Sequence, residues 1–199
     1  MQVNLNVQDN FADYSRRLQE VLAKADWSGV HKLAQGMLEC WQKGGRVFLC
    51  GNGGSAGNAI HLANDFLYGV SKKTGGGLKV MALSANSAVI TCLANDVGYD
   101  NIFSEQLAVL AEKDDLLIVL SGSGNSKNIV CTLEQAKLMG VRSFAILGFS
   151  GGKSKEIADV AIHFAVEDMQ IAEDLQLIVG HMVMQWLYAN RPRSTDIGN

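Results

Sequence analysis

The sequence has little proline, no long apolar run and no excess of basic residues. The single proline is Pro192, and no stretch of about 18 apolar residues could cross a bilayer as a helix. With a net charge of −3, the chain has no basic field to attract nucleic acid. The first residues also lack the apolar core of a signal peptide. These absences predict a cytoplasmic protein that binds neither membranes nor nucleic acid.

Paired cysteines are also missing. Cys40, Cys50, Cys92 and Cys131 are scattered singly, and none belongs to a C-x-x-C motif. This spacing argues against zinc fingers, a redox pair and a disulfide framework. We therefore predict four buried free thiols.

The apolar pattern predicts an α/β fold. Two amphipathic helices occupy the first forty residues, and short apolar runs follow at 47–50, 80–83, 116–120, 144–147 and 160–162. These runs do not alternate with polar residues, which is typical of parallel strands covered on both faces. The segments between them are long enough for crossover helices. We expect a three-layer sandwich of the flavodoxin-like or Rossmann-like type, with a five-stranded parallel sheet.

The last predicted helix, 170–190, is apolar on most of its circumference, which favours burial against another subunit. Residues 1–190 are expected to form one domain, and residues 191–199 a flexible tail.

Two glycine-serine loops carry the strongest chemical signal. Residues 51–55 (GNGGS) follow the first predicted strand, and residues 121–126 (SGSGNS) follow the third. Ligands of parallel α/β sheets bind at the carboxyl ends of the strands. Glycines let backbone N–H groups approach an anion, serines add donors, and helix N-termini favour phosphate. The loops predict a phosphate site; the alternative is a pair of ordinary serine-capped turns.

Two nucleotide-binding motifs fit less well. Residues 51–56 match a loose dinucleotide fingerprint, but the second strand is followed by no carboxylate that could hold a ribose. No Gly-Lys-Ser/Thr follows the glycines, which excludes a Walker A loop.

Over nearly its whole length the chain resembles the phosphoheptose isomerases and their sugar isomerase (SIS) domain relatives. Both loops, His61 and Asp65 in the helix after the first loop, Asn95-Asp96 and Gln176 carry the resemblance. It implies a tetramer with sites at subunit contacts and a sugar phosphate as ligand. The implied substrate-binding residues are Asn52, Gly53, Gly54, Ser55, His61, Asp96, Ser121, Gly122, Ser123, Ser126 and Gln176.

The family moves a proton between C1 and C2 of sedoheptulose 7-phosphate through an enediol, which yields D-glycero-D-manno-heptose 7-phosphate. It uses a glutamate four residues after the helix histidine and a histidine eight residues after the last-helix glutamine. Counted from His61 and from Gln176 respectively, these positions hold Asp65 and Met184. Asp65 could act as a base, but Met184 cannot carry a proton.

Two other residues are candidates for the second proton carrier. His181 lies about 60° around the helix from the expected direction, and Glu173 shares a helix face with Gln176. The catalytic candidates are therefore Asp65, His181 and Glu173. The alternative interpretation makes His181 an interface histidine and Glu173 a carboxylate stabilised by the helix dipole.

The implied reaction requires no cofactor, but the resemblance also allows zinc held by His61, Asp65 and Gln176, with His181 or Glu173 completing the set. The first hypothesis is a phosphoheptose-type isomerase. The alternatives are a non-catalytic sugar-phosphate-binding or partner-binding protein and an isomerase for another phosphosugar.

Overall fold

A computed structural model of the chain describes residues 7–72 and 75–192. Its centre is a parallel sheet of five strands in the order β2-β1-β3-β4-β5. The strands are β1 (Arg46–Gly51), β2 (Lys79–Ala82), β3 (Leu116–Ser121), β4 (Arg142–Leu147) and β5 (Val160–His163). The predicted five-stranded parallel sheet is confirmed. Most of the predicted tail, residues 193–199, lies outside the described residues.

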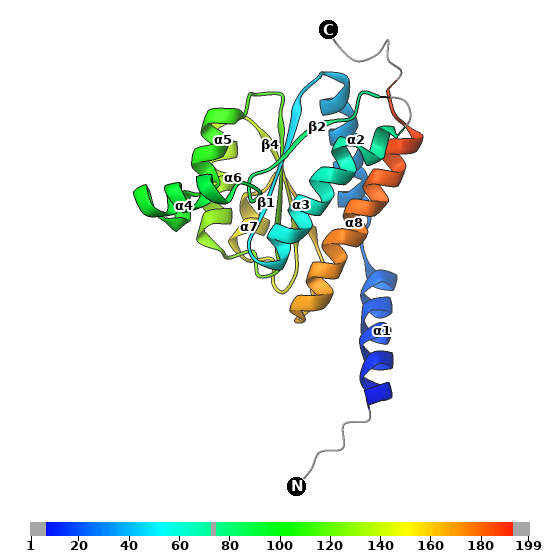
Figure 1. The fold of residues 1–199 in the computed structure, drawn as a ribbon. Helices are drawn as coiled ribbons and strands as arrows, with labels where there is room; N and C mark the ends of the chain where they lie inside the picture. Colours follow the sequence, from blue (N-terminus) through cyan, green and yellow to red (C-terminus); the bar gives the residue numbers. More distant parts are fainter. Residues whose placement is uncertain (1–6, 73–74, 193–199) are drawn as a thin grey trace.

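Helices cover both faces of the sheet, as Figure 1 shows. One layer contains α2 (Ser28–Gln42), α3 (Gly54–Leu67) and α8 (Met169–Ala189), and the other contains α4 (Ser87–Asp96), α5 (Ser104–Leu110), α6 (Lys127–Met139) and α7 (Gly152–Ile157). Short 3-10 turns lie at η1 (Gly69–Ser71) and η2 (Tyr99–Asn101). A separate apolar core fills the space on each face of the sheet. The predicted three-layer sandwich is therefore confirmed.

The central strands explain the absence of polar alternation in the sequence. Every residue of β3 is buried, and in β1 and β4 only the first residue is exposed. Strand order reverses between β1 and β3, because β2 lies on one side of β1 and β3 on the other. A ligand crevice is expected at the carboxyl ends of these two strands.

The terminal helices pack differently from one another. Helix α8 buries a stripe at i, i+4 spacing, formed by Leu175, Val179, Val183 and Leu187, against the core of its own chain. Helix α1 (Val7–Lys24) projects from the body, and hydrogen bonds from Tyr14 and Arg17 attach it to the start of α8. The apolar character of α8 is thus largely explained within one chain.

The thiols are only partly as predicted. All four cysteines are free, and Cys40 and Cys50 are buried, but Cys131 is half-buried and Cys92 is exposed. The prediction of four buried thiols was wrong because α4, which carries Cys92, has no buried residue at all. None of the helices in the described part of the chain combines the length and apolar character needed to span a bilayer.

Candidate active site

The two glycine-serine loops lie side by side. Strands β1 and β3 are paired, with Gly51 opposite Leu120, so the loops that follow them leave the same edge of the sheet. In the second loop, the Ser121 hydroxyl accepts from the backbone N–H of Gly124 at 3.0 Å, and Ser123 accepts from that of Asn125 at 3.2 Å. Because these hydroxyls accept, their own protons are available for an anion.

Glycine is required at particular points of the first loop. A Cβ on Gly51 would lie 2.6 Å from the carbonyl oxygen of Ser55. Gly53 has a φ of 55°, which residues with side chains rarely adopt, and directly precedes α3. The first turn of α3 can therefore approach the end of β1 closely, while the N–H groups of Ala56 and Gly57 already donate to backbone carbonyls of Asn52 and Gly53. The N–H groups of Gly54 and Ser55, at the N-terminus of the helix, are the ones suited to an anion.

Gln176 holds Ser55 in place from α8. Its side chain is buried, and its Nε2 donates to the Ser55 hydroxyl at 3.0 Å. Its Oε1 accepts from Nδ2 of Asn58, also at 3.0 Å. Both the nitrogen and the oxygen of this amide are thus bonded within the protein, so Gln176 supports the first loop by holding Ser55.

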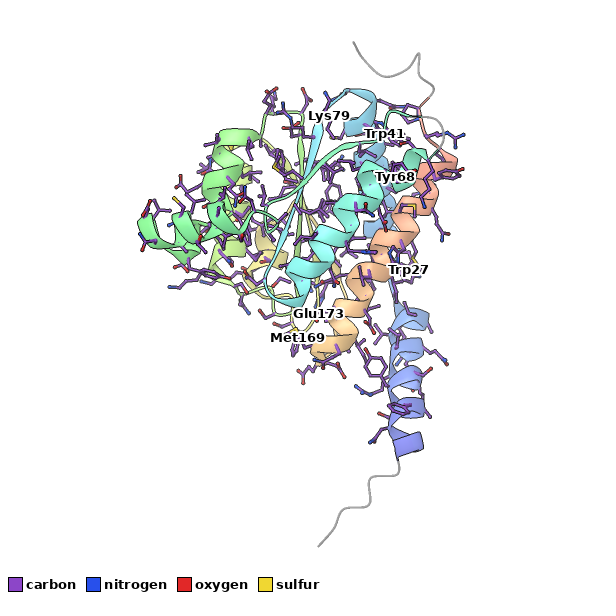
Figure 2. The ribbon with its side chains drawn as sticks, in the orientation of Figure 1. Trp27, Trp41, Tyr68, Lys79, Met169 and Glu173 are labelled. Atoms are coloured by element: carbon purple, nitrogen blue, oxygen red, sulfur yellow. The ribbon has the colours of Figure 1, made fainter. Side chains whose placement is uncertain are left out.

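Glu173 reaches the start of α3 from the other helix. Its carboxylate lies against Gly54, where any Cβ would collide with it. Figure 2 shows Glu173 near the beginning of α8, on the side that faces α3. The structure therefore brings this predicted residue to the first loop.

Three side chains meet farther along α3 and α8. The Nε2 atoms of His61 and His181 are 3.1 Å apart, and each lies 3.4 Å from Oδ2 of Asp65. The side chains of His61 and His181 are 51% and 44% exposed, so the cluster is open to solvent. His181 thus contacts Asp65, although counting from Gln176 placed it about 60° around the helix from the expected direction.

The offset disappears when the spacing is counted from Glu173. His181 follows Glu173 by eight residues, which is the spacing that the resemblance assigns to the last-helix glutamine and histidine. Met184 instead packs at the border of the apolar core, near Gly69. Our choice of Gln176 as the starting point, and hence of Met184 as the histidine position, was therefore wrong. The eight-residue spacing to a carboxylate was the signal that sequence reasoning missed.

The cluster of His61, Asp65 and His181 fits a metal ion. A point equidistant from its three ligand atoms lies about 1.9 Å from each in their plane, and zinc–ligand distances to nitrogen and oxygen are about 2.0–2.2 Å. These separations are compatible with one zinc ion bound by all three atoms. Two imidazoles and one carboxylate with open positions are also the donor set of catalytic zinc and iron sites.

Two predicted sugar-binding residues are engaged elsewhere. The side chain of Asn52 exchanges hydrogen bonds with Asn128 and accepts one from Tyr99. Asp96, the last residue of α4, is exposed and accepts from Asn95 and Cys92 beside it. Among the described residues, no contact brings Asp96 to either loop. Sequence reasoning did not identify Asn128, Tyr99 or Asn58.

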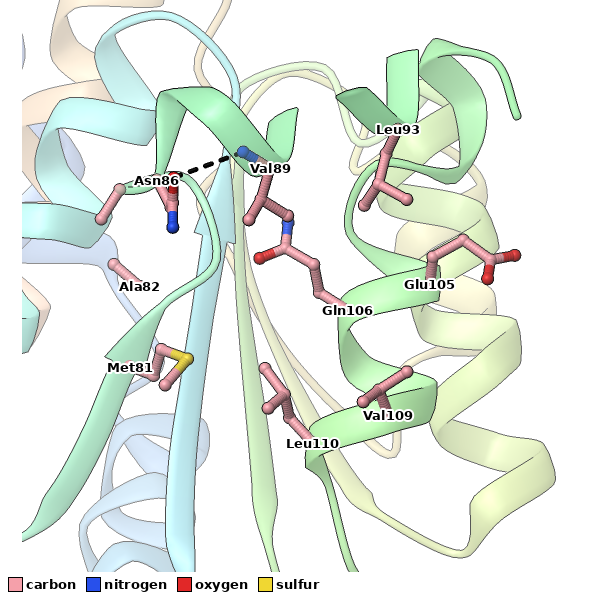
Figure 3. A pocket seen from close by; sticks show the side chains of 10 residues that line it. Met81, Ala82, Asn86, Val89, Leu93, Glu105, Gln106, Val109 and Leu110 are labelled. Atoms are coloured by element: carbon pink, nitrogen blue, oxygen red, sulfur yellow. Dashed lines mark hydrogen bonds between the residues drawn. The ribbon is translucent and has the colours of Figure 1, made fainter. Parts of the chain in front are cut away.

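A separate cavity of about 570 Å³ lies between β2, α4 and α5 (Figure 3). Its lining is mainly apolar, and its two amide side chains, Asn86 and Gln106, are bonded to the backbone. Asn86 accepts from the N–H groups of Ala88 and Val89, and Gln106 donates to backbone carbonyls. With few free polar groups, this cavity is poorly suited to a sugar phosphate.

Comparisons with known proteins agree with the fold. A family model of the SIS domain matches residues 10–148. The phosphoheptose isomerase of Akkermansia muciniphila is 35% identical over 182 residues, covering 91% of this chain and 90% of that protein. That of Helicobacter pylori strain Shi470 is 36% identical over 164 residues, covering 82% of this chain and 83% of that protein.

A solved structure extends the likeness to three dimensions. The phosphoheptose isomerase of Francisella tularensis superimposes with a TM-score of 0.88 at 26% identity, covering 94% of this chain and all of that chain. Sequence and fold thus agree over most of the molecule, and the chain belongs to the phosphoheptose isomerase family of SIS domain proteins.

Proposed function

We propose that the chain is a ketose–aldose isomerase that converts sedoheptulose 7-phosphate into D-glycero-D-manno-heptose 7-phosphate. The observation that carries this proposal is the cluster of Asp65, His61 and His181. These residues lie on α3 and α8, the two helices that a hydrogen bond joins beside the first loop. The names of the relatives support the same reaction.

The substrate is proposed to lie along the neighbouring surfaces of α3 and α8. Ser55, Ser121, Ser123 and Ser126 would hold its phosphate, with the backbone of Gly53, Gly54 and Gly122 close to the anion. Asn58, His61 and Asp65 all contact α8, so they form one stripe along α3. The stripe begins near the phosphate loops and ends at the cluster. His61 follows Ser55 by six residues, which is about 9 Å along a helix. The reacting end of the sugar would then reach the cluster.

Asp65 is proposed as the base of the reaction. Its carboxylate would remove the proton from C1 of the ketose and return it to C2 of the enediol. Glu173, beside the first loop, would donate a proton to the oxygen on C2 and accept one from the hydroxyl on C1, so that no proton is gained or lost overall. In the metal-free protein, His181 is the other candidate for this transfer between oxygens, because its Nε2 is then not engaged by a metal ion.

We also propose that His61, Asp65 and His181 hold a zinc ion. When bound, zinc would polarise the carbonyl and hydroxyl oxygens at C1 and C2. Gln176 is a weaker candidate as ligand, because its amide oxygen already accepts from Asn58. Zinc titration by calorimetry tests this assignment: His181→Ala should lose binding and Gln176→Ala should retain it. The opposite pattern would contradict it.

The proposed assembly is a homotetramer in the cytoplasm. Closed tetramers with two-fold symmetry need two different interfaces, and the chain exposes apolar side chains on two separate faces. Leu67 and Tyr68 are exposed at the end of α3, two and three residues after Asp65, whereas Met81 and Val109 border the cavity of Figure 3. Four free cysteines suit a reducing compartment. Light scattering should give four chains, and Val109→Glu should reduce this number to two.

Steady-state kinetics with sedoheptulose 7-phosphate test the assigned roles. Asp65→Asn should lower kcat by at least a hundredfold, because it removes the base. Ser121→Ala should mainly raise KM, because it removes a phosphate donor. Ser143→Ala is the matched control: this buried serine bonds Asp159 near the start of β4, at the opposite end of the sheet. Unchanged kinetics in Asp65→Asn would contradict the proposal.

A further inference from the structure

The two phosphate loops are joined by a pair of asparagines. Nδ2 of Asn52 donates to Oδ1 of Asn128 at 2.8 Å, and Nδ2 of Asn128 donates to Oδ1 of Asn52, also at 2.8 Å. Asn52 belongs to the loop after β1, and Asn128 lies in the first turn of α6, directly after the loop that follows β3. In the described part of the chain, these are the only side-chain hydrogen bonds between the two loop regions.

The pair is held from both sides. Asn128 is buried, with only 2% of its surface exposed. The oxygen of Asn52 also accepts from the Tyr99 hydroxyl at 3.0 Å, so both of its lone pairs are used. A substrate could therefore reach only the remaining N–H of Asn52. This geometry suits a side chain that fixes the distance between the two loops better than one that binds sugar hydroxyls.

The spacing of the loops matters because both would contact the same anion. Ser55 follows Asn52 by three residues, and Ser126 precedes Asn128 by two. A relative shift of the loops would lengthen some of the phosphate hydrogen bonds, which weaken steeply beyond about 3.2 Å. The two amides connect the loops within a few residues of these serines.

We infer that Asn128 and Asn52 act together as positioning residues that set the separation of the phosphate loops, with Tyr99 holding Asn52 in the required orientation. Asn128 itself touches no substrate. The inference rests on the proposed function only in assuming that the loops bind phosphate. It predicts that the two asparagines affect phosphate affinity as one unit.

A double-mutant cycle on the full chain tests this coupling, with inorganic phosphate as the probe and calorimetry as the readout. Asn52→Ala and Asn128→Ala should each weaken phosphate binding about tenfold, which corresponds to about 1.4 kcal/mol. The double variant should bind no more weakly than either single variant. In turnover, Asn128→Ala should raise KM about tenfold and leave kcat within about twofold.

Two further variants separate positioning from general stability. Ser143→Ala removes a buried hydrogen bond far from the loops and should leave phosphate affinity unchanged. Tyr99→Phe removes one hydroxyl from an exposed side chain, so the protein should remain folded even if Asn128→Ala does not. It should weaken phosphate binding about threefold, and the effect should vanish in the Asn52→Ala background.

The possible failures are distinguishable. If the wild-type chain binds no phosphate, both the proposed function and this inference are overturned. If it binds phosphate but the single losses multiply in the double variant, or Tyr99→Phe has the same effect with and without Asn52, only the positioning inference is overturned.

Discussion

Replacing Gly180 with alanine should push α3 and α8 apart at the candidate metal centre. A Cβ at this position would lie 2.7 Å from Cδ1 and 3.0 Å from Cγ of Leu62, and closer still to Cδ2. Leu62 is fully buried, so it has no free space into which to turn. Gly180 and Leu62 directly adjoin His181 and His61 in the sequence, so any separation of the helices is transmitted to the two imidazoles.

The expected magnitude follows from two opposing effects. Alanine is favoured over glycine in a helix interior by about 1 kcal/mol, whereas overpacking of a filled core costs about 1–3 kcal/mol. The variant should therefore be less stable than the wild type by up to about 2 kcal/mol. Normal packing requires carbon atoms at least about 3.5 Å apart, so the helices should separate by several tenths of an ångström or more, weakening zinc binding at least tenfold.

Urea denaturation and zinc calorimetry measure both effects. Gly57→Ala is the matched control, because Gly57 lies in α3 and a Cβ there would meet nothing within 4 Å. This variant should gain up to about 1 kcal/mol of stability and keep its zinc affinity. The reasoning would be refuted if Gly180→Ala were stabilised as much as Gly57→Ala and bound zinc with wild-type affinity.

Other substitutions and labels test separate parts of the structure. Asp168 caps α8 and pairs with Arg17, which holds the pKa of its carboxyl below the usual range. Asp168→Ala should therefore cost about 1 kcal/mol at pH 7, and the difference should fade as the pH drops below about 4 and the wild-type carboxyl becomes protonated; urea denaturation at several pH values measures it. Thiol labelling at pH 8 should modify exposed Cys92 in the native protein. Cys40 should react only after unfolding, since burial raises the pKa of its thiol to about 12; a rapid native reaction at Cys40 would contradict its placement.

The fold was predictable because its signals are local. Central strands such as β3 are buried along their whole length, so their sequence is continuously apolar and easy to distinguish from the amphipathic helices. The placement of the loops after β1 and β3 was predictable for a related reason, since each loop directly follows a continuously apolar strand and the carboxyl ends of parallel strands share one edge of the sheet. Neither inference required knowledge of contacts between distant residues.

The cluster of His61, Asp65 and His181 was harder to predict because it depends on how two helices are aligned. Sequence reasoning started the eight-residue spacing at Gln176 and considered Glu173 only as a possible proton carrier. The packing of α8 on α3, with Gly180 against Leu62 and Gln176 bonded to Ser55 and Asn58, places His181 beside His61.

The asparagine pair could not be predicted for a similar reason. Asn52 and Asn128 are 76 residues apart, and nothing in either local sequence indicates that their amides meet. Polar pairs of this kind become visible only when the loops are placed relative to each other.

The most direct test of the proposed isomerase is proton NMR of sedoheptulose 7-phosphate in deuterium oxide with the zinc-loaded protein. The account predicts new aldose signals and exchange of the proton at C1, both absent in Asp65→Asn. A spectrum that stays unchanged although the sugar phosphate binds saturably to the wild-type chain would contradict it, and would identify the chain as a binding protein or as an enzyme for another sugar phosphate.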